Sequence, residues 1–538
     1  MKNIIKIILN LKVKNLYLLS IIIWSSGISN ISFGQFQNIQ VNSDTLTTCN
    51  EPSIALNPNN SNNIVIGTNN TYFFSTFDAG NSWTEGKMSS SYGVWGDPSL
   101  AFDSNGNLFF GHLSGEPPLS GRWGDRIVIQ KSTDGGLSWN DGSFTGLNRP
   151  KFEDKDWISV DLTNSTYKNN IYAAWTEFDS LFIADTSFKS RILFSYSTDA
   201  GETWSNPLKI SDVEGDCQDD DNTTEGAVPA VGPDGEIYIA WAGPEGIVMD
   251  RSFDGGVTFS DDIFVTEQVG GWGWGYEIEG IYGNGFPQTV CDTSHSPYRG
   301  TVYVLWADQR NGLLNPDIFL KRSTDKGIAW SEMKTVNNDN SGRPQFFPWM
   351  CIDPITGIIY IVYYDRSNTI GPMTEVYLAR SADGGETFQN YLISESAFEA
   401  EVQKFIGDYT NIIAYNGKVY PVWTRSDQFG RSIIMANINE STLDVKNDVV
   451  VSDFQLYQNY PNPFNPSTKI LYQIPEKCFV CLKVFDVLGN EVAVLVNKEI
   501  PAGTYEADFN RSQLASGIYF YRIQTEKYSA IKKMILIK

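Results

Sequence analysis

Four acidic residues stand at corresponding points of a repeated sequence pattern. Glu51, Asp97, Asp156 and Asp408 each come just before a short apolar segment that is typical of a strand. Carboxyl groups placed around a bound sugar can act as acid, base or nucleophile. An acidic residue at the start of a strand can equally be a turn former that accepts backbone N–H groups. Both interpretations stay open for each residue, but the four together favour a functional site.

A second set of side chains carries binding chemistry. Arginines that follow the second apolar segment of a repeat could pair bidentately with an anionic group. Two tryptophans in the Gly-rich segment 270–276 could stack on a sugar face, or fill space inside the protein as part of a plugging loop. The candidate substrate-binding residues are Glu51, Arg310, Arg366, Arg425, Trp272 and Trp274.

An acidic segment suggests a metal ion. The stretch from Asp212 to Glu225 holds seven carboxylates, and oxygen-rich clusters suit calcium outside the cell. The segment is not an EF-hand loop, because Cys217 stands where that loop needs Gly. The alternative is a solvated acidic loop. We expect no cofactor to be required, and the candidate calcium ligands are Asp216, Asp219, Asp220 and Asp221.

The elements that must position these residues form a repeat array. One octet recurs six times, as in Ser132–Trp139, with successive Asp residues 55 to 71 residues apart. Asp and Gly at these places suit a tight turn, since the carboxylate accepts backbone N–H groups and Gly allows positive φ. The six octet aspartates, to which we assign a structural role, are Asp78, Asp134, Asp199, Asp254, Asp325 and Asp383.

A pair of short strands comes before each octet, and a seventh pair lacks one. Four short strands per unit at this period are typical of β-propeller blades. In the seventh unit, 430–438 can supply the third strand, and 36–41 can close the ring as the fourth. We therefore predict an all-β fold with a seven-bladed (alternatively six-bladed) propeller over residues 35–440.

The octets resemble the Asp-boxes of the sialidase family, and the resemblance covers most of residues 50–430. It implies turns between the third and fourth strands of each blade, on the face away from a substrate. It also implies acid or base roles for Asp97, Asp156 and Asp408, a Tyr nucleophile at Tyr409, and an anion clamp of arginines. The family's first-blade arginine has no counterpart, because the corresponding stretch reads Asn-Glu-Pro-Ser over 50–53.

The C-terminal part is a separate module. Residues 441–453 form a polar linker, and the alternating apolar segments and Gly turns of 454–538 predict a small β-sandwich. Its segments 454–468, 484–489, 514–519 and 532–538 closely resemble the type A sorting domain of the type IX secretion system. The resemblance implies that the secretion machinery is a partner. The alternative is a structural or sugar-binding sandwich.

The first 34 residues are typical of a secretory signal peptide. Four lysines precede an apolar run, Leu16–Trp24, that is too short to span a bilayer. We expect the mature chain to begin near Gln35, to lack a membrane anchor and to be a monomer. The chain has 40 Lys and Arg against 63 Asp and Glu, a formal charge of −23. This charge excludes a general nucleic-acid binder, because a polyanion would be repelled.

Two classes of function fit this sequence. The first is a secreted or cell-surface glycoside hydrolase that acts on an extracellular glycan or glycoprotein through carboxylate acid/base chemistry. The second is a non-catalytic, adhesin-like propeller that binds glycan or protein at the cell surface. The charge of the propeller favours a neutral glycan over a polyanion.

Overall fold

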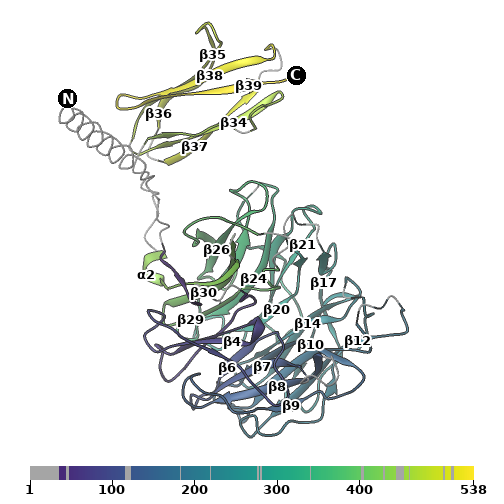
Figure 1. Ribbon diagram of the computed structural model, residues 1–538. Coiled ribbons are helices and arrows are strands. Elements are labelled where there is room, and N and C mark those ends of the chain that lie inside the picture. The colour runs from purple at the N-terminus through teal and green to yellow at the C-terminus, as the bar shows by residue number, and fades with distance from the viewer. Residues whose placement is uncertain are drawn as a thin grey trace, which may run out of the picture. The chain divides into compact units, whose positions relative to one another are not determined.

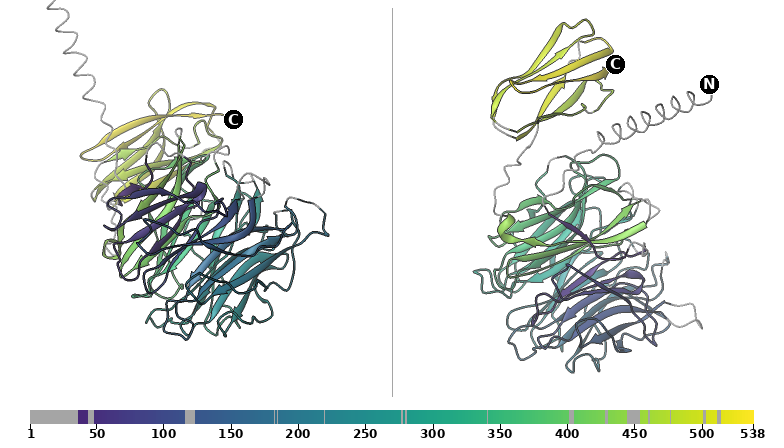
Figure 2. Two further views of the ribbon diagram at one scale, coloured as in Figure 1. Left: turned by 60° about the horizontal axis from the view of Figure 1, so that its bottom comes forward. Right: turned by 60° about the vertical axis from the view of Figure 1, so that its left-hand side comes forward.

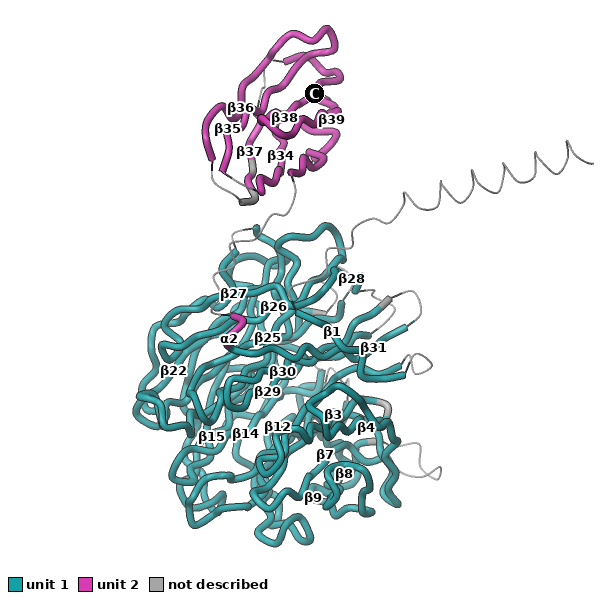
Figure 3. Tube along the Cα trace, turned by 90° about the vertical axis from the view of Figure 1, so that its left-hand side faces the viewer, with its two compact units in different colours: residues 1–440 teal, residues 441–538 magenta. Residues whose placement is uncertain are grey.

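The structure is a computed structural model that divides into two compact units, residues 1–440 and 441–538 (Figure 3). The predicted signal peptide and residues 444–453 of the predicted linker lie outside the described residues. The described residues are 36–43, 48–115, 123–181, 183, 185–218, 220–275, 278, 281–339, 341–400, 405–427, 430–443, 454–459, 461–475, 477–500, 503–510 and 514–538.

Among the described residues, the N-terminal unit contains seven antiparallel sheets in which four strands follow one another across the sheet. We call these sheets blades one to seven in chain order. Blade one is β2 (Ser53–Leu56), β3 (Ile64–Thr68), β4 (Tyr72–Thr76) and β5 (Thr84–Lys87). Blade two is β6 (Ser99–Phe102), β7 (Leu108–Gly115), β8 (Trp123–Ser132) and β9 (Ser143–Thr145). Blade three is β10 (Phe152–Val160), β11 (Ile171–Phe178), β12 (Ser190–Ser197) and β13 (Leu208–Lys209).

The remaining blades repeat this meander. Blade four is β14 (Glu225–Val231), β15 (Ile237–Gly243), β16 (Gly246–Ser252) and β17 (Ile263–Thr266). Blade five is β20 (Gln288–Cys291), β21 (Val302–Asp308), β22 (Asp317–Ser323) and β23 (Lys334–Thr335). Blade six is β24 (Gln345–Ile352), β25 (Ile359–Asp365), β26 (Met373–Ser381) and β27 (Gln389–Leu392). Blade seven is β29 (Asn411–Tyr415), β30 (Lys418–Asp427), β31 (Gly430–Ala436) and β1 (Asn38–Gln40).

Short elements complete this unit. The strands β18 (Gly273–Gly275) and β19 (Gly283–Asn284) pair as a hairpin between blades four and five. Two further short strands, β28 (Phe398–Glu399) and β32 (Ile438–Asn439), pair with β26 and β30. The described helices are η1 (Asn69–Thr71) and α2 (Glu440–Leu443). No helix in the described parts of the chain has the length and apolarity needed to cross a membrane.

The inner strands of the blades form a closed cycle. Each of β2, β6, β10, β14, β20, β24 and β29 contacts the next, and β29 contacts β2. Figures 1 and 2 show the blades arranged around this centre. The predicted all-β propeller fold is therefore confirmed. The strand β1 pairs with β31, with Asn38 opposite Ala436, so the expected N-terminal segment joins the last blade.

Burial explains why the second strands carry so many aromatic residues. Trp175, Trp241, Trp306 and Trp423 occupy matching places in the second strands of four blades, and each is at most 1% exposed. A strand buried on both faces needs large apolar side chains on both, because its neighbours are other blades rather than water. The rings fill the widening space between blades at a distance from the axis.

The octets lie where the sequence placed them, between the third and fourth strands. In the second blade Asp134 Oδ1 accepts the backbone N–H groups of Leu137 (3.0 Å) and Ser138 (2.9 Å). Gly136, at φ 89°, brings its carbonyl oxygen within 2.7 Å of Ser75 Oγ in the preceding blade. The turn therefore closes one blade and attaches it to its neighbour.

The C-terminal unit is a small β-sandwich, as predicted from its strand pattern. One sheet has the order β33 (Gln455–Leu456), β34 (Ser467–Ile474), β37 (Gly503–Asn510). The other has the order β36 (Glu491–Ile500), β35 (Cys478–Phe485), β38 (Gly517–Gln524), β39 (Ser529–Leu536). Alternate residues such as Val480, Leu482 and Val484 point into a shared core and are fully buried.

Candidate functional site

An unusual backbone conformation recurs just before the inner strands. Glu51, Asp97, Lys155 and Phe347 all have φ between 50° and 54°, which non-Gly residues rarely adopt. In blades four and seven a glycine with positive φ, Gly226 or Gly407, takes this place. In blades three, four and six the register with the second strand shifts at this point, as in a β-bulge. Such strained positions cluster at functional sites.

This conformation corrects the sequence alignment of the four carboxylates. By backbone conformation, Lys155 is the residue that corresponds to Glu51 and Asp97, whereas Asp156 comes one residue later. Asp408 likewise follows Gly407, which holds the positive φ in the last blade. The sequence prediction missed Lys155 because the bulge of β10 inserts a residue that no apolar pattern reveals.

A cavity of about 350 Å³ lies where the inner strands begin, and we call it the mouth cavity. Its wall combines carboxylates, amides, one lysine and aromatic rings. The lining residues are Glu51, Asn69, Trp95, Gly96, Asp97, Leu113, Asp154, Lys155, Glu225, Trp272, Tyr282, Asn284, Phe286, Phe405 and Asp408. A narrower, mostly apolar space of about 40 Å³ shares five of these residues and reaches Asp156, Trp157, Trp349 and Tyr409.

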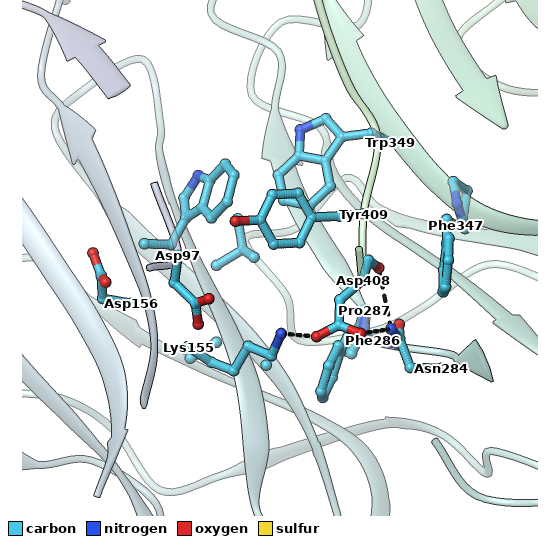
Figure 4. Close-up of a pocket in the computed structure, with 15 residues that line it drawn as sticks. Asp97, Lys155, Asp156, Asn284, Phe286, Pro287, Phe347, Trp349, Asp408 and Tyr409 are labelled. Carbon is cyan, nitrogen blue, oxygen red and sulfur yellow. Dashed lines mark hydrogen bonds and ion pairs between the residues drawn. The ribbon is translucent and has the colours of Figure 1, made fainter. Parts of the chain in front are cut away.

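Lys155 is the electrostatic centre of the site. Its ammonium group forms an ion pair with Asp408 and lies 5.3 Å from the ring centre of Phe286 (Figure 4). Burial alone would lower the pKa of Lys155, but the carboxylates of Asp408 and Asp97 hold it well above its ordinary value. Residues from blades two, three and seven therefore converge on one buried charge.

Glu51 is a buried carboxyl group that stays protonated to unusually high pH. It is 1% exposed, accepts a hydrogen bond from the amide of Asn69, and accepts the backbone N–H of Asp408 at 3.1 Å. Burial raises its pKa well above the ordinary value, and the nearby charge of Asp408 raises it further. Asn284 donates to Asp408 Oδ1 at 3.3 Å, so Asp408 is held from two sides.

Asp97 differs from Glu51 and Asp408 because its carboxylate has no hydrogen-bond partner among the described residues. It is 9% exposed, and only its backbone N–H is bound, by Asn69 Oδ1 at 3.2 Å. Figure 4 shows its carboxylate on the side that faces Lys155. A buried polar group without a partner is the feature expected of a group that awaits a ligand.

Asp156 and Tyr409, which the sequence also proposed as catalytic, lie deeper. Asp156 is 2% exposed, and neither carboxyl oxygen has a hydrogen-bond partner in the described structure. Its Oδ2 faces Gly111 of blade two, where an added Cβ would lie only 2.7 Å away. Burial raises the pKa of Asp156 well above its usual range, and the charge of Asp97 adds to this. Asp156 therefore lies between blades two and three and does not line the mouth cavity.

The predicted nucleophile role of Tyr409 lacks support. Its ring packs against Trp157 (5.6 Å between centres) and Trp349 (5.8 Å), and its hydroxyl has no hydrogen-bond partner among the described residues. Burial raises the pKa of Tyr409 well above its usual value, and the charge of Asp97 adds to this. A nucleophile needs a base within hydrogen-bond reach, and Tyr409 has none there.

None of the three arginines of the predicted clamp lines the mouth cavity. Arg310 forms an ion pair with Asp308 of its own blade. Arg366 is 1% exposed and donates to Thr374 Oγ1 at 2.9 Å. Arg425 donates to Ser396 Oγ at 3.0 Å. Arg310 and Arg366 follow second strands, and Arg425 lies in one. A second strand is one strand spacing further from the axis than the inner strand, so each arginine pairs with a nearby residue instead of meeting the others at the centre.

Of the two interpretations of Trp272 and Trp274, burial agrees with rings that fill space inside the protein. Trp272 and Trp274 are 3% and 2% exposed, because the β18–β19 hairpin folds their rings inward. Trp272 stacks on Phe286 with ring centres 4.4 Å apart, and its indole N–H donates to the carbonyl oxygen of Thr223 at 3.0 Å. Trp272 lines the mouth cavity, whereas Trp274 does not. The exposed rings at the mouth cavity are those of Trp95 (53%) and Phe405 (41%), which the sequence prediction did not select.

The acidic segment uses its carboxylates within the protein. Asp216 and Asp220 each accept a backbone N–H group two residues further on, and Asp221 accepts that of Gly273 at 3.2 Å. Asp219 lies outside the described residues. The described part of the chain contains no group of three or more His, Cys, Asp or Glu residues placed to hold a metal ion. Calcium binding by this segment stays a prediction, which calorimetry with calcium chloride would test.

The fold and site define a β-propeller with a polar mouth cavity, followed by a β-sandwich. Residues 458–538 match the family described as the secretion system C-terminal sorting domain, so the C-terminal unit is such a domain. Its presence indicates type IX secretion to the cell surface or the extracellular space. No curated protein matches the chain.

Several solved structures are similar to this chain at low identity. A protein of unknown function from Dyadobacter fermentans is 12% identical, with 76% of this chain and 98% of that chain covered and a TM-score of 0.42. The Hadza microbial sialidase Hz136 is 13% identical (70% and 73% covered, TM-score 0.40). A Penicillium chrysogenum α-L-arabinanase complexed with arabinobiose is 12% identical (75% and 98% covered, TM-score 0.41). Because these likenesses are distant, the propeller assignment rests on the strand topology of this chain itself.

Proposed function

We propose that this protein is exported and binds a non-anionic extracellular glycan in the mouth cavity. The observation that carries the proposal is the lining of that cavity. It places hydrogen-bonding groups such as Asp97, Asn284 and Asn69 beside the exposed ring of Trp95. Sugars present hydroxyl groups at their edges and C–H groups on their faces, so this combination of polar groups and a ring suits them.

The charge of the cavity argues for a sugar without carboxylate or sulfate groups. The described lining contains several carboxylates but a single cation, Lys155, which already pairs with Asp408. An anionic sugar would meet repulsion with no arginine to offset it. The sorting domain supports delivery to the place where such glycans occur. We expect the secretion machinery to engage that domain and residues 1–34 to be removed during export.

A glycan array with the mature full-length chain tests this proposal. We expect retention of one or more non-anionic glycans, loss of that retention in Trp95→Ala, and no retention of sialylated glycans. The control is Phe77→Ala, which removes an exposed ring in the first octet turn, away from the mouth cavity. Retention that survives Trp95→Ala unchanged would show that the mouth cavity is not the binding site.

Glycoside hydrolysis is the second candidate, and one observation favours it. Burial raises the pKa of Glu51 well above its usual value, whereas the neighbouring Asp408 forms an ion pair with Lys155. Carboxyl groups with different protonation states are what acid/base hydrolysis requires. A panel of chromogenic glycosides would show turnover by the wild type and its loss in Asp97→Asn. Absence of turnover together with array binding would leave the binding function alone.

A further inference from the structure

We propose that the mouth cavity selects a ligand that carries a primary ammonium group, of which a de-N-acetylated amino sugar is the simplest glycan. This inference rests on the proposed function, because it names the class of glycan that the same cavity would take. It follows from the charge of the lining, from the lack of a hydrogen-bond partner for the carboxylate of Asp97 among the described residues, and from the surroundings of Lys155.

The lining of the mouth cavity has an excess of negative charge. Its only cation in the described structure is Lys155, against the carboxyl groups of Glu51, Asp97, Asp154, Glu225 and Asp408. Even with Glu51 protonated, the carboxylates outnumber the ammonium group. Carboxylates that share a partly buried space repel one another, so a further cation is stabilised there.

Asp97 is the carboxylate that such a cation would meet. Nine-tenths of the residue is buried, its oxygen atoms have no hydrogen-bond partner among the described residues, and it lines the mouth cavity on the side of Lys155. Lys155 shares its charge between Asp97 and its ion pair with Asp408, so an N–H donor from a ligand would further stabilise the partly buried carboxylate of Asp97. A neutral hydroxyl group could also donate, but its hydrogen bond is weaker than that of an ammonium group.

The protein itself shows how an ammonium group fits this cavity. The Nζ atom of Lys155 pairs with one carboxylate and lies 5.3 Å and 5.7 Å from the ring centres of Phe286 and Tyr409. A ligand ammonium group beside Asp97 would find the same two elements. Asp97 supplies the carboxylate, and Trp95, two residues earlier, supplies an exposed ring face.

Isothermal titration calorimetry tests the inference with two glycans of equal length, a glucosamine tetramer and an N-acetylglucosamine tetramer. The measurement uses the mature full-length chain at mildly acidic pH, where the amines are ionised. We expect the glucosamine tetramer to bind about tenfold more tightly than the N-acetylglucosamine tetramer, in line with the gain from a charged hydrogen bond. The preference for the free amines should become smaller at high salt, because salt screens charges in a cavity that opens to solvent.

The variant Asp97→Asn tests whether Asp97 causes the preference for the free amines, and Asp234→Asn is the matched control. Asp234 is an exposed carboxylate on the turn between β14 and β15, and its side chain is 77% exposed. We expect Asp97→Asn to abolish the preference for the free amines, by weakening their binding more than that of the acetylated tetramer, and Asp234→Asn to leave both affinities unchanged. A melting temperature of Asp97→Asn equal to that of the wild type shows that the variant is folded.

Different results separate this inference from the proposed function. Equal affinity of the wild type for the two tetramers would overturn the ammonium inference without the need for any variant. A preference that survives Asp97→Asn would overturn the assignment to Asp97. Binding of some other neutral glycan but of neither tetramer would overturn the inference and leave the proposed function standing. A failure to bind any glycan would overturn both.

Discussion

Asp250 of β16 gives a quantitative prediction about stability and pH. It is fully buried, and its Oδ1 accepts hydrogen bonds from Ser260 Oγ (2.7 Å) and the backbone N–H of Arg251 (2.6 Å). Its Oδ2 has no hydrogen-bond partner in the described structure. Burial raises the pKa of Asp250 from 3.8 to about 7, and the nearby carboxylates of Asp262 and Asp212 contribute to the rise.

The direction of the pH effect on stability depends on whether the folded or the unfolded chain keeps Asp250 protonated. Between the two pKa values only the folded chain keeps Asp250 protonated, so the free energy of unfolding falls as the pH rises from about 4 to about 7. Each pKa unit is worth ~1.4 kcal/mol, so this one group removes at most ~4 kcal/mol of stability by about pH 8. Partial access of water would reduce that figure, and we expect a loss of ~2–4 kcal/mol.

Asp250→Asn tests this prediction, because the amide keeps the shape and the Oδ1 acceptor but does not titrate. Denaturant unfolding at about pH 5 and about pH 8 should show a much smaller pH-dependent loss in this variant than in the wild type. Asp234→Asn, on the same blade but exposed, should behave as the wild type does. Residual pH dependence should come from Asp262, whose pKa burial raises to about 6. Equal pH dependence in the wild type and Asp250→Asn would refute the reasoning.

Three further predictions concern the site and the turns. Lys155→Met leaves the partly buried carboxylate of Asp408 unpaired, so we expect a loss of ~3 kcal/mol at neutral pH that shrinks in acid, measured by unfolding at both pH values. Gly111→Ala places a Cβ 2.7 Å from Asp156 Oδ2, and we expect a loss of ~1–3 kcal/mol that Asp156→Ala relieves in the double variant; additive losses would contradict that contact. Asp134→Ala removes the acceptor of two backbone N–H groups and should lower stability by ~1 kcal/mol, whereas an unchanged melting temperature would show that the octet turn does not need it.

The repeat architecture was predictable because its signals are local. An octet such as Ser132–Trp139 contains within eight residues the Asp, the Gly and the aromatic residue that its turn needs. The joining of the chain's start to the last blade also followed from counting strands, since the seventh unit lacked a fourth strand that β1 supplies. These features depend on pattern and number rather than on side-chain detail.

The centre of the site was only partly predictable. The sequence selected Asp97 and Asp408, but it aligned Asp156 with them and missed Lys155, because the bulge within β10 adds one residue to that strand. A positive φ at a non-Gly residue leaves no trace in an apolar pattern. The pairing of Lys155 with Asp408 joins residues 253 positions apart, so only the closed ring brings them together.

The roles of the aromatic residues could not be predicted from their neighbours in sequence. Trp272 is surrounded by glycines, which suggested an exposed loop, but the hairpin partner β19 returns from further along the chain and buries the ring. Trp95 lies outside the octets and the predicted strands, and it is exposed at the mouth cavity. Exposure is decided by which segments pack together, and a single sequence does not state that.

A co-crystal structure with a glycan selected on the array tests the central claim most directly. The account predicts a sugar in the mouth cavity, stacked on Trp95 and within hydrogen-bond distance of Asp97. A sugar bound to the C-terminal sandwich, or to the opposite face of the propeller, would contradict it.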